Sequence, residues 1–139
     1  MTASAPNWLP MATALHRFPD GSSHFDWFFG RTAAPSDPDE RSARTFRCPL
    51  DPRGACAGWT CPLEALTDHR AHYLTTTSER TLADGSTITP LQRGRWMDAG
   101  IDEIIIQWEA SPAFHRIRLI GQPSVRAECS ASGASLGSV

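Results

Sequence analysis

The sequence predicts a mainly β protein, a compact antiparallel β-barrel of about seven or eight short strands with little helix. Alternating apolar and polar stretches recur along the chain, with turn signals about every 8–12 residues and almost no helical period. A two-sheet sandwich is the alternative architecture. The 139 residues suit one domain. We expect a loose lead-in over residues 1–10, the barrel over 11–129, and a disordered Ser/Gly/Ala-rich tail over 130–139.

The first two strands are expected to form a hairpin. Residues 11–17 form one arm, the Pro19–Ser22 stretch favours a tight turn, and residues 23–29 return from it. His16 and His24 then lie on opposite arms, which a hairpin can bring face to face. A polar loop over 31–42 and a strand over 43–48 follow.

The rest of the chain is expected to be a series of short elements. Three prolines over residues 49–62 indicate an irregular excursion, and Pro62 is suited to begin a helical turn over 62–66. A strand should begin near His72. The turn at 83–86 predicts a second hairpin between 80–82 and 87–89. Further strands are expected over 91–97, 101–109 and 114–120, the last two as an antiparallel pair turning at Ser111-Pro112.

Composition excludes some functional classes. Thirteen basic and 15 acidic residues give a net charge of -2, which does not demand charge-driven binding of nucleic acid. No apolar run approaches the roughly 18 residues of a membrane span, and the first ten residues lack the pattern of a secretory signal. We therefore expect a soluble, cytoplasmic protein with no membrane partner.

The cysteines are interpreted in that light. Because cytoplasmic thiols stay reduced, we expect no disulfide. Cys48, Cys56 and Cys61, with a histidine, allow a zinc site, although their spacing lacks a CxxC pair.

A histidine and a carboxylate two residues apart are the most informative feature. His24 and Asp26 point to one face of a strand, about 7 Å apart, and can share a divalent metal. His16, Asp68, His69 and Tyr73 complete the polar set. Imidazoles with a carboxylate suit Mn²⁺ or Zn²⁺, and His69 or Tyr73 could hold or protonate a leaving oxygen. The plainer alternatives are a solvated strand, a histidine that binds backbone, and a tyrosine that packs in the core.

The order of these motifs is that of a known family. HRFPDGSSHFDW, ARTFRCP, LTDHRAHYL and LQRGRW follow one another over roughly residues 12–121. The succession resembles the 3′-phosphoesterase domain of bacterial DNA ligase D, in particular its small stand-alone relatives. The resemblance implies a β-barrel with a crater and Mn²⁺-dependent removal of 3′-phosphates and 3′-ribonucleotides during DNA repair.

The resemblance also implies roles for single residues and for partners. It places His16, His24 and Asp26 as metal ligands and Asp68, His69 and Tyr73 as catalytic residues. Nucleic-acid 3′ ends, and separate ligase or polymerase proteins, are the implied partners.

The chain departs from the family where phosphate is gripped. Phe28 stands where the family has an arginine, and CPLEALT replaces the strand that carries a second one. Arg31, Arg44, Arg47 and Arg70 are candidate substitutes. Three hypotheses follow: a metal-dependent phosphoesterase, a weakened or inactive barrel that binds DNA ends or a repair partner, and an interaction domain with incidental histidines.

Overall fold

The computed structural model describes residues 7–33, 37–51, 60–109, 114–121 and 126–133. The strands are β1 Leu9–Arg17, β2 Ser23–Gly30, β3 Arg41–Cys48, β4 Thr60–Pro62, β5 Glu64–Arg70, β6 Arg80–Thr81, β7 Thr87–Gly100, β8 Glu103–Trp108, β9 Phe114–Ile120 and β10 Arg126–Gly133. Within the described residues, one short 3₁₀ helix, η2, spans Ala71–Leu74. The mainly β prediction is confirmed, with ten strands in place of seven or eight. No helix in the described ranges is long and apolar enough to cross a membrane.

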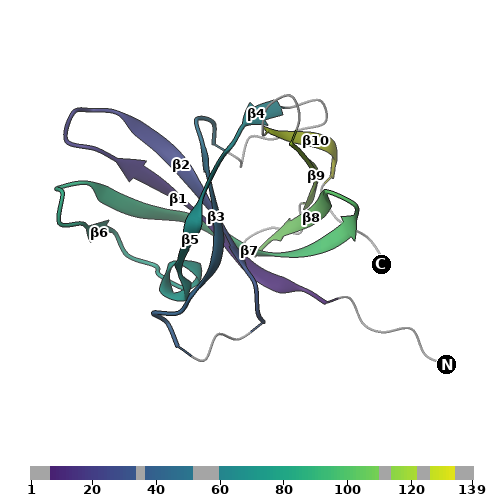
Figure 1. The fold of residues 1–139 in the computed structure, drawn as a ribbon, viewed down its shortest axis with the longest axis horizontal. Helices are drawn as coiled ribbons and strands as arrows, with labels where there is room; N and C mark the ends of the chain where they lie inside the picture. The colour runs from purple at the N-terminus through teal and green to yellow at the C-terminus, as the bar shows by residue number, and fades with distance from the viewer. Residues whose placement is uncertain (1–6, 34–36, 52–59, 110–113, 122–125, 134–139) are drawn as a thin grey trace.

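All ten strands belong to one antiparallel sheet, in which β6 pairs beside the main path on β7 and the order is β4-β10-β9-β8-β7-β1-β2-β3-β5. The strands from β3 through β4 and β10 to β7 follow one another around a ring (Figure 1). Leu63 alone separates β4 from β5, which lie at opposite ends of the pairing order. The described strands do not close the sheet by pairing, so the predicted barrel is not confirmed.

Alternation along the strands creates two apolar clusters on opposite faces. The inner cluster is built around Trp27, Phe29, Phe46, Ile106 and Trp108. The outer cluster consists of small and medium residues, Ala12, Ala14, Phe28, Ala43, Ala71, Leu74 and Ile88. Because successive side chains point to opposite faces, β2 supplies Phe29 to one cluster and Phe28 to the other.

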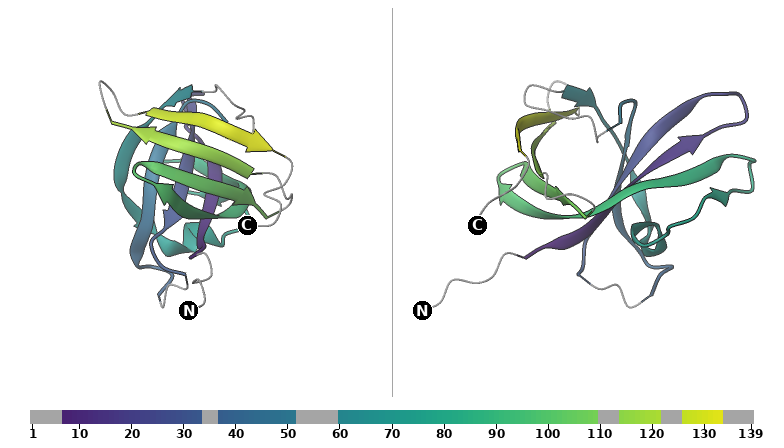
Figure 2. Two further views of the ribbon diagram at one scale, coloured as in Figure 1. Left: turned by 90° about the vertical axis from the view of Figure 1, so that its right-hand side faces the viewer. Right: turned by 180° about the vertical axis from the view of Figure 1, so that it is seen from behind.

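The predicted hairpins are confirmed in their pairing. His16 lies directly opposite His24 across β1 and β2, Arg80 opposite Ile88 across β6 and β7, and β8 pairs antiparallel with β9. The strands expected at 87–89 and 91–97 form one continuous strand, β7. Viewed from behind, the β1–β2 and β6–β7 hairpins project together to one side of the ring (Figure 2). The Ser111-Pro112 turn lies outside the described residues.

Two local predictions are wrong between residues 62 and 77. The helical turn expected at 62–66 does not form: Pro62 ends β4, and Glu64 begins β5, which pairs with the edge of β3. The strand expected from His72 is helix η2. There the backbone N–H groups of Ala71 and His72 donate to the Glu40 and Pro38 carbonyls, so the chain leaves the sheet after Arg70.

The predicted ends of the domain also move. Strand β1 begins at Leu9, within the expected lead-in. Strand β10 runs to Gly133, so the tail is ordered beyond residue 130.

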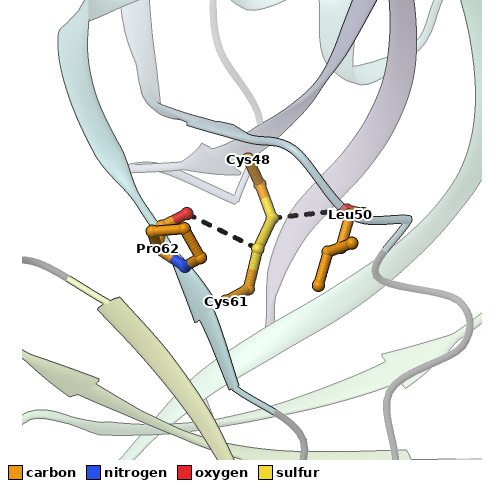
Figure 3. The surroundings of a disulfide bond; sticks show 4 residues. All are labelled: Cys48, Leu50, Cys61 and Pro62. Carbon is orange, nitrogen blue, oxygen red and sulfur yellow. Dashed lines mark hydrogen bonds between the residues drawn. A yellow bond between two sulfur atoms is a disulfide. The ribbon is translucent and has the colours of Figure 1, made fainter.

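The prediction that the cysteines stay reduced is wrong, because Cys48 and Cys61 form a disulfide (Figure 3). Their Cα atoms lie 6.7 Å apart, within the usual range for a disulfide, and both residues are buried. The sheet brings them together by returning β4 past the end of β3, which their sequence spacing does not reveal. Since both sulfurs are bonded, they cannot serve as thiolate ligands of the predicted zinc site; Cys56 lies outside the described residues.

Candidate metal centre

The β1–β2 hairpin assembles the candidate centre. Its register places His16 beside His24, Ala14 beside Asp26 and Ala12 beside Phe28. These side chains all project from the outer face, where the small alanines leave room beside Asp26.

The three predicted ligands converge on one point. His24 Nε2 lies 3.0 Å from Asp26 Oδ1, and His16 Nδ1 lies 3.7 Å from Asp26 Oδ2. The three ligand atoms lie within 4.8 Å of one another. Zinc binds imidazole nitrogen and carboxylate oxygen at about 2.0–2.2 Å, which allows two ligand atoms up to about 4.4 Å apart. A small inward shift of the side chains would therefore let one ion contact all three.

Two polar atoms of the centre are buried without a hydrogen bond. They are His24 Nε2 and Asp26 Oδ1. Although they lie 3.0 Å apart, their orientation does not give a hydrogen bond. Buried polar atoms are almost always satisfied. A cation held between the nitrogen and the oxygen would satisfy both, so the residues present fit a divalent metal.

Burial also shapes the electrostatics of the centre. It raises the pKa of Asp26 to about 7, an effect that the nearby Arg47 guanidinium opposes. Burial, then Arg47 and His16, lower the pKa of His24 to about 4. The imidazole is therefore neutral near pH 7, the form that binds metals. A bound cation would favour the ionised form of the Asp26 carboxyl.

Ser86 and Asp84 orient His16. Its Nε2 lies 2.9 Å from Ser86 Oγ, and the Ser86 hydroxyl donates to Asp84 Oδ1. Hydrogen bonds from Ser86 lower the pKa of Asp84, so Asp84 is an ionised acceptor. Ser86 then accepts from His16 Nε2–H, which leaves the lone pair of Nδ1 facing Asp26. Metal-binding histidines commonly have such a partner on the other ring nitrogen.

His69 and Tyr73 form an aromatic wall beside the centre. A bulge in β5, with Leu66 opposite Thr45 but His69 opposite Ala43, turns His69 to this face. The His69 ring centroid lies 5.6 Å from that of Phe28, and Tyr73 stacks on Phe28 at 5.2 Å. The charge of His69 also contributes to lowering the pKa of His16, so the wall lies within electrostatic reach of the triad.

Asp68 is not brought to the triad. Its carboxylate accepts two hydrogen bonds from Arg31, and Arg41 donates to its backbone carbonyl. Arg31 lowers the pKa of Asp68, which favours the ionised carboxylate over a proton donor. These contacts connect β5 to the end of β2. The catalytic role of Asp68 stays a prediction.

Sequence reasoning missed Ser86 and Asp84, and it left Arg47 as one of four candidates. The structure places Arg47 directly opposite Asp26 on β3, and its Nε is buried without a hydrogen-bond partner. The sequence signal available for Arg47 was its position in the predicted strand, two residues after Thr45. For Ser86 and Asp84 the signal was their turn motif, which gives no hint of contact with His16.

No family model matches the sequence, and no curated protein or solved structure matches it either. The likeness to the ligase D phosphoesterase domain therefore remains an expectation drawn from the motifs. The donor set leaves the metal open, because two imidazoles and a carboxylate serve Mn²⁺, Zn²⁺ and Fe²⁺ alike.

Proposed function

We propose that this chain is a metal-dependent phosphoesterase whose cation is held by His16, His24 and Asp26. The observation that carries the proposal is the buried pair His24 Nε2 and Asp26 Oδ1, 3.0 Å apart with no hydrogen bond. The sequence motifs add nucleic-acid 3′ ends as the substrate class, with Mn²⁺ as the metal and repair proteins as partners.

The chain's own residues supply the remaining functions. A bound divalent cation would polarise a phosphoryl oxygen. Arg47, beside Asp26, would hold a second phosphoryl oxygen through its buried Nε, in place of the arginine absent at Phe28.

His69 is suited to move the proton. Its Nδ1 lies 3.0 Å from the Thr67 carbonyl oxygen, and a carbonyl only accepts, so Nδ1 carries a hydrogen. Nε2 is left to exchange a proton with the leaving oxygen. Water oxygen bonds to phosphorus and the ester P–O bond breaks. The leaving oxygen takes the proton of Nε2 from the His69 ring that carries a hydrogen on both nitrogens. The attacking water releases its proton to solvent, and solvent returns a proton to Nε2. The products are a hydroxyl and inorganic phosphate.

Binding without turnover is the second candidate function. Phe28 favours it, since its ring is buried between Tyr73 and His69, where the family grips phosphate with a guanidinium. A protein of this kind would still bind the metal and a phosphorylated end.

The test combines metal binding with a 3′-end assay. Mn²⁺ binding is titrated calorimetrically, and an oligonucleotide with a 3′-phosphate is followed for conversion to a 3′-hydroxyl. We expect His24→Ala to abolish both metal binding and conversion, and His69→Gln to abolish conversion while Mn²⁺ still binds.

Each negative result in these assays supports a different hypothesis. A wild-type protein that binds Mn²⁺ and the phosphorylated oligonucleotide without conversion supports binding without turnover. Absence of metal binding would overturn both functions and leave the histidines incidental.

A further inference from the structure

A pocket lies on the outer face of the sheet, and one of its lining residues, Ala14, is the strand partner of Asp26. It has a volume of about 170 Å³, well below the roughly 300–1,000 Å³ typical of sites for drug-sized ligands. Because paired Cα atoms lie about 4.5–5.5 Å apart, the pocket begins one strand spacing from Asp26. It admits a compact group.

The pocket has an apolar floor and a polar rim. Its floor consists of Ala12, Ala14, Phe28, Ile88 and Pro90, and its rim includes Tyr73, Thr76, Thr77 and Arg80. Phe28 and Tyr73 stack on each other at an interplanar angle of 11°, which gives the pocket a fixed aromatic wall. The floor suits a small apolar organic group.

Arg80 places a positive charge at the far side of this floor. Its Nη1 lies 3.1 Å from His72 Nε2, and no carboxylate in the described part of the chain pairs with it. Arg80 lies opposite Ile88, which lies opposite His16. The backbone of Arg80 is therefore two strand spacings, roughly 10 Å, from the backbone of His16. Its guanidinium lies beside His72, where it is suited to bind a second anion.

The charged side chains elsewhere on the protein argue against binding of a long stretch of nucleic acid. Outside the metal centre, three described arginines are paired with acids, in the pairs Arg31–Asp68, Arg93–Glu109 and Arg116–Glu103, and the whole chain has a net charge of -2. Polynucleotides are bound through several cations arranged along a stripe. A compact ligand needs only the cations at its two ends.

We propose that this pocket binds the organic group of a compact phosphomonoester that carries a second anionic group. The phosphate lies at the metal triad, the organic group on the Ala12–Phe28 floor, and the second anion at Arg80. The proposal rests on the phosphoesterase function and favours a compact phosphomonoester as its substrate over the nucleic-acid 3′ end that the motifs imply.

Three probes separate the contributions in the Mn²⁺-loaded protein. Inorganic phosphate reports the metal centre alone, phenyl phosphate adds the floor, and 4-carboxyphenyl phosphate adds Arg80. We expect phenyl phosphate to bind about tenfold more tightly than inorganic phosphate, since it buries an apolar ring. The carboxylate should add about a further tenfold through a charge-assisted hydrogen bond. Calorimetry measures all three.

Two variants assign these increments to the pocket. Ala12→Leu fills the floor and should remove the advantage of the ring, whereas Ala65→Leu, the same change at an exposed position on β5, should not. Arg80→Gln should remove only the carboxylate's increment. Retained Mn²⁺ binding shows that each variant is folded, and Arg80, being exposed, provides a test even where Ala12→Leu does not fold.

Several results would overturn the pocket proposal while the phosphoesterase stands. They are equal affinity for phosphate and phenyl phosphate, a carboxylate increment that survives Arg80→Gln, and tighter binding of a 3′-phosphorylated oligonucleotide than of 4-carboxyphenyl phosphate. Loss of Mn²⁺ binding by the wild-type protein, by contrast, would overturn the proposed function itself.

Discussion

Two turns of the molecule share the tripeptide Asp-Gly-Ser but differ in what they contact. One turn, Asp20–Ser22, joins β1 to β2, and the other, Asp84–Ser86, joins β6 to β7. In both, the serine amide and hydroxyl donate to the aspartate carboxylate. Both glycines adopt a positive φ, 89° at Gly21 and 83° at Gly85. The local structure of the two turns is therefore the same.

Their surroundings are not the same. Ser22 is exposed, whereas Ser86 is buried at 0 % exposure and lies 2.9 Å from His16 Nε2. The pairing of β1 with β7 places His16 beside Ile88, two residues beyond Ser86. Topology thus makes one of two equivalent turns part of the metal centre, and the first can serve as the control for the second.

Removing the Cys48–Cys61 disulfide tests whether the metal centre depends only on contacts close to it, such as that of Ser86 with His16. Replacing Cys48 and Cys61 together with alanine should lower the free energy of unfolding by about 3 kcal/mol, because the unfolded chain regains the entropy of an open loop. Urea unfolding measures the loss. Mn²⁺ affinity without denaturant should change little, since both cysteines belong to the inner cluster, on the face of the sheet opposite to the triad. A collapse of metal binding in the folded double variant would show that the centre depends on this tie.

The serines give the sharpest comparison. Ser86→Ala should weaken Mn²⁺ binding by about 10–100-fold, because His16 loses the partner that fixes its tautomer and ring orientation. Ser22→Ala removes the same hydroxyl from the equivalent turn and should leave the affinity unchanged. Calorimetric titration of the two variants checks this. Equal effects of the two substitutions would contradict the view that Ser86 orients His16 for the metal.

The glycines compare the turns as backbone structures. Alanine at Gly21 or Gly85 must adopt a positive φ, which costs roughly 1–2 kcal/mol. At Gly21 the added Cβ meets open space, whereas at Gly85 it would lie 3.3 Å from Pro19 Cγ. Chemical denaturation should therefore show a loss of stability for both variants, the larger at Gly85. A neutral Gly85→Ala would be inconsistent with the backbone conformation described for that turn.

The same pair of turns shows how far the sequence alone could go. Local chemistry predicted both hairpins, and strand alternation predicted that His24 and Asp26 share a face. The contact of Ser86 with His16 spans 70 residues and depends on which strands become neighbours, so no local pattern contained it. The Cys48–Cys61 disulfide was missed for the same reason.

The errors between residues 62 and 77 have a different origin. The sequence there is ambiguous between helix and strand, and its conformation is decided by the partners it meets. Strand β5 takes the open edge of β3, and the bulge within it turns His69 toward Phe28. Propensity alone cannot supply either result, because both depend on a strand about 20 residues earlier in the chain.

Asp84 offers the smallest and most selective test of the comparison. Hydrogen bonds from Ser86 lower the pKa of Asp84 from 3.8, as those from Ser22 lower the pKa of Asp20. A lowered carboxyl pKa stabilises the fold above pH 3.8, and this stability is lost as the pH falls through the folded-state pKa. Both turns should therefore weaken in the same acidic range.

At neutral pH, Mn²⁺ affinity should depend on Asp84 but not on Asp20. Asp84→Asn keeps an acceptor for Ser86 but loses the charge, so Mn²⁺ affinity should fall by less than about tenfold, since a neutral hydrogen bond of about 1 kcal/mol remains. Asp20→Asn should have no effect on Mn²⁺ binding. If Asp84→Asn weakened binding as strongly as Ser86→Ala, the charge of Asp84 rather than the orientation of His16 would be the main contribution of this turn to the centre.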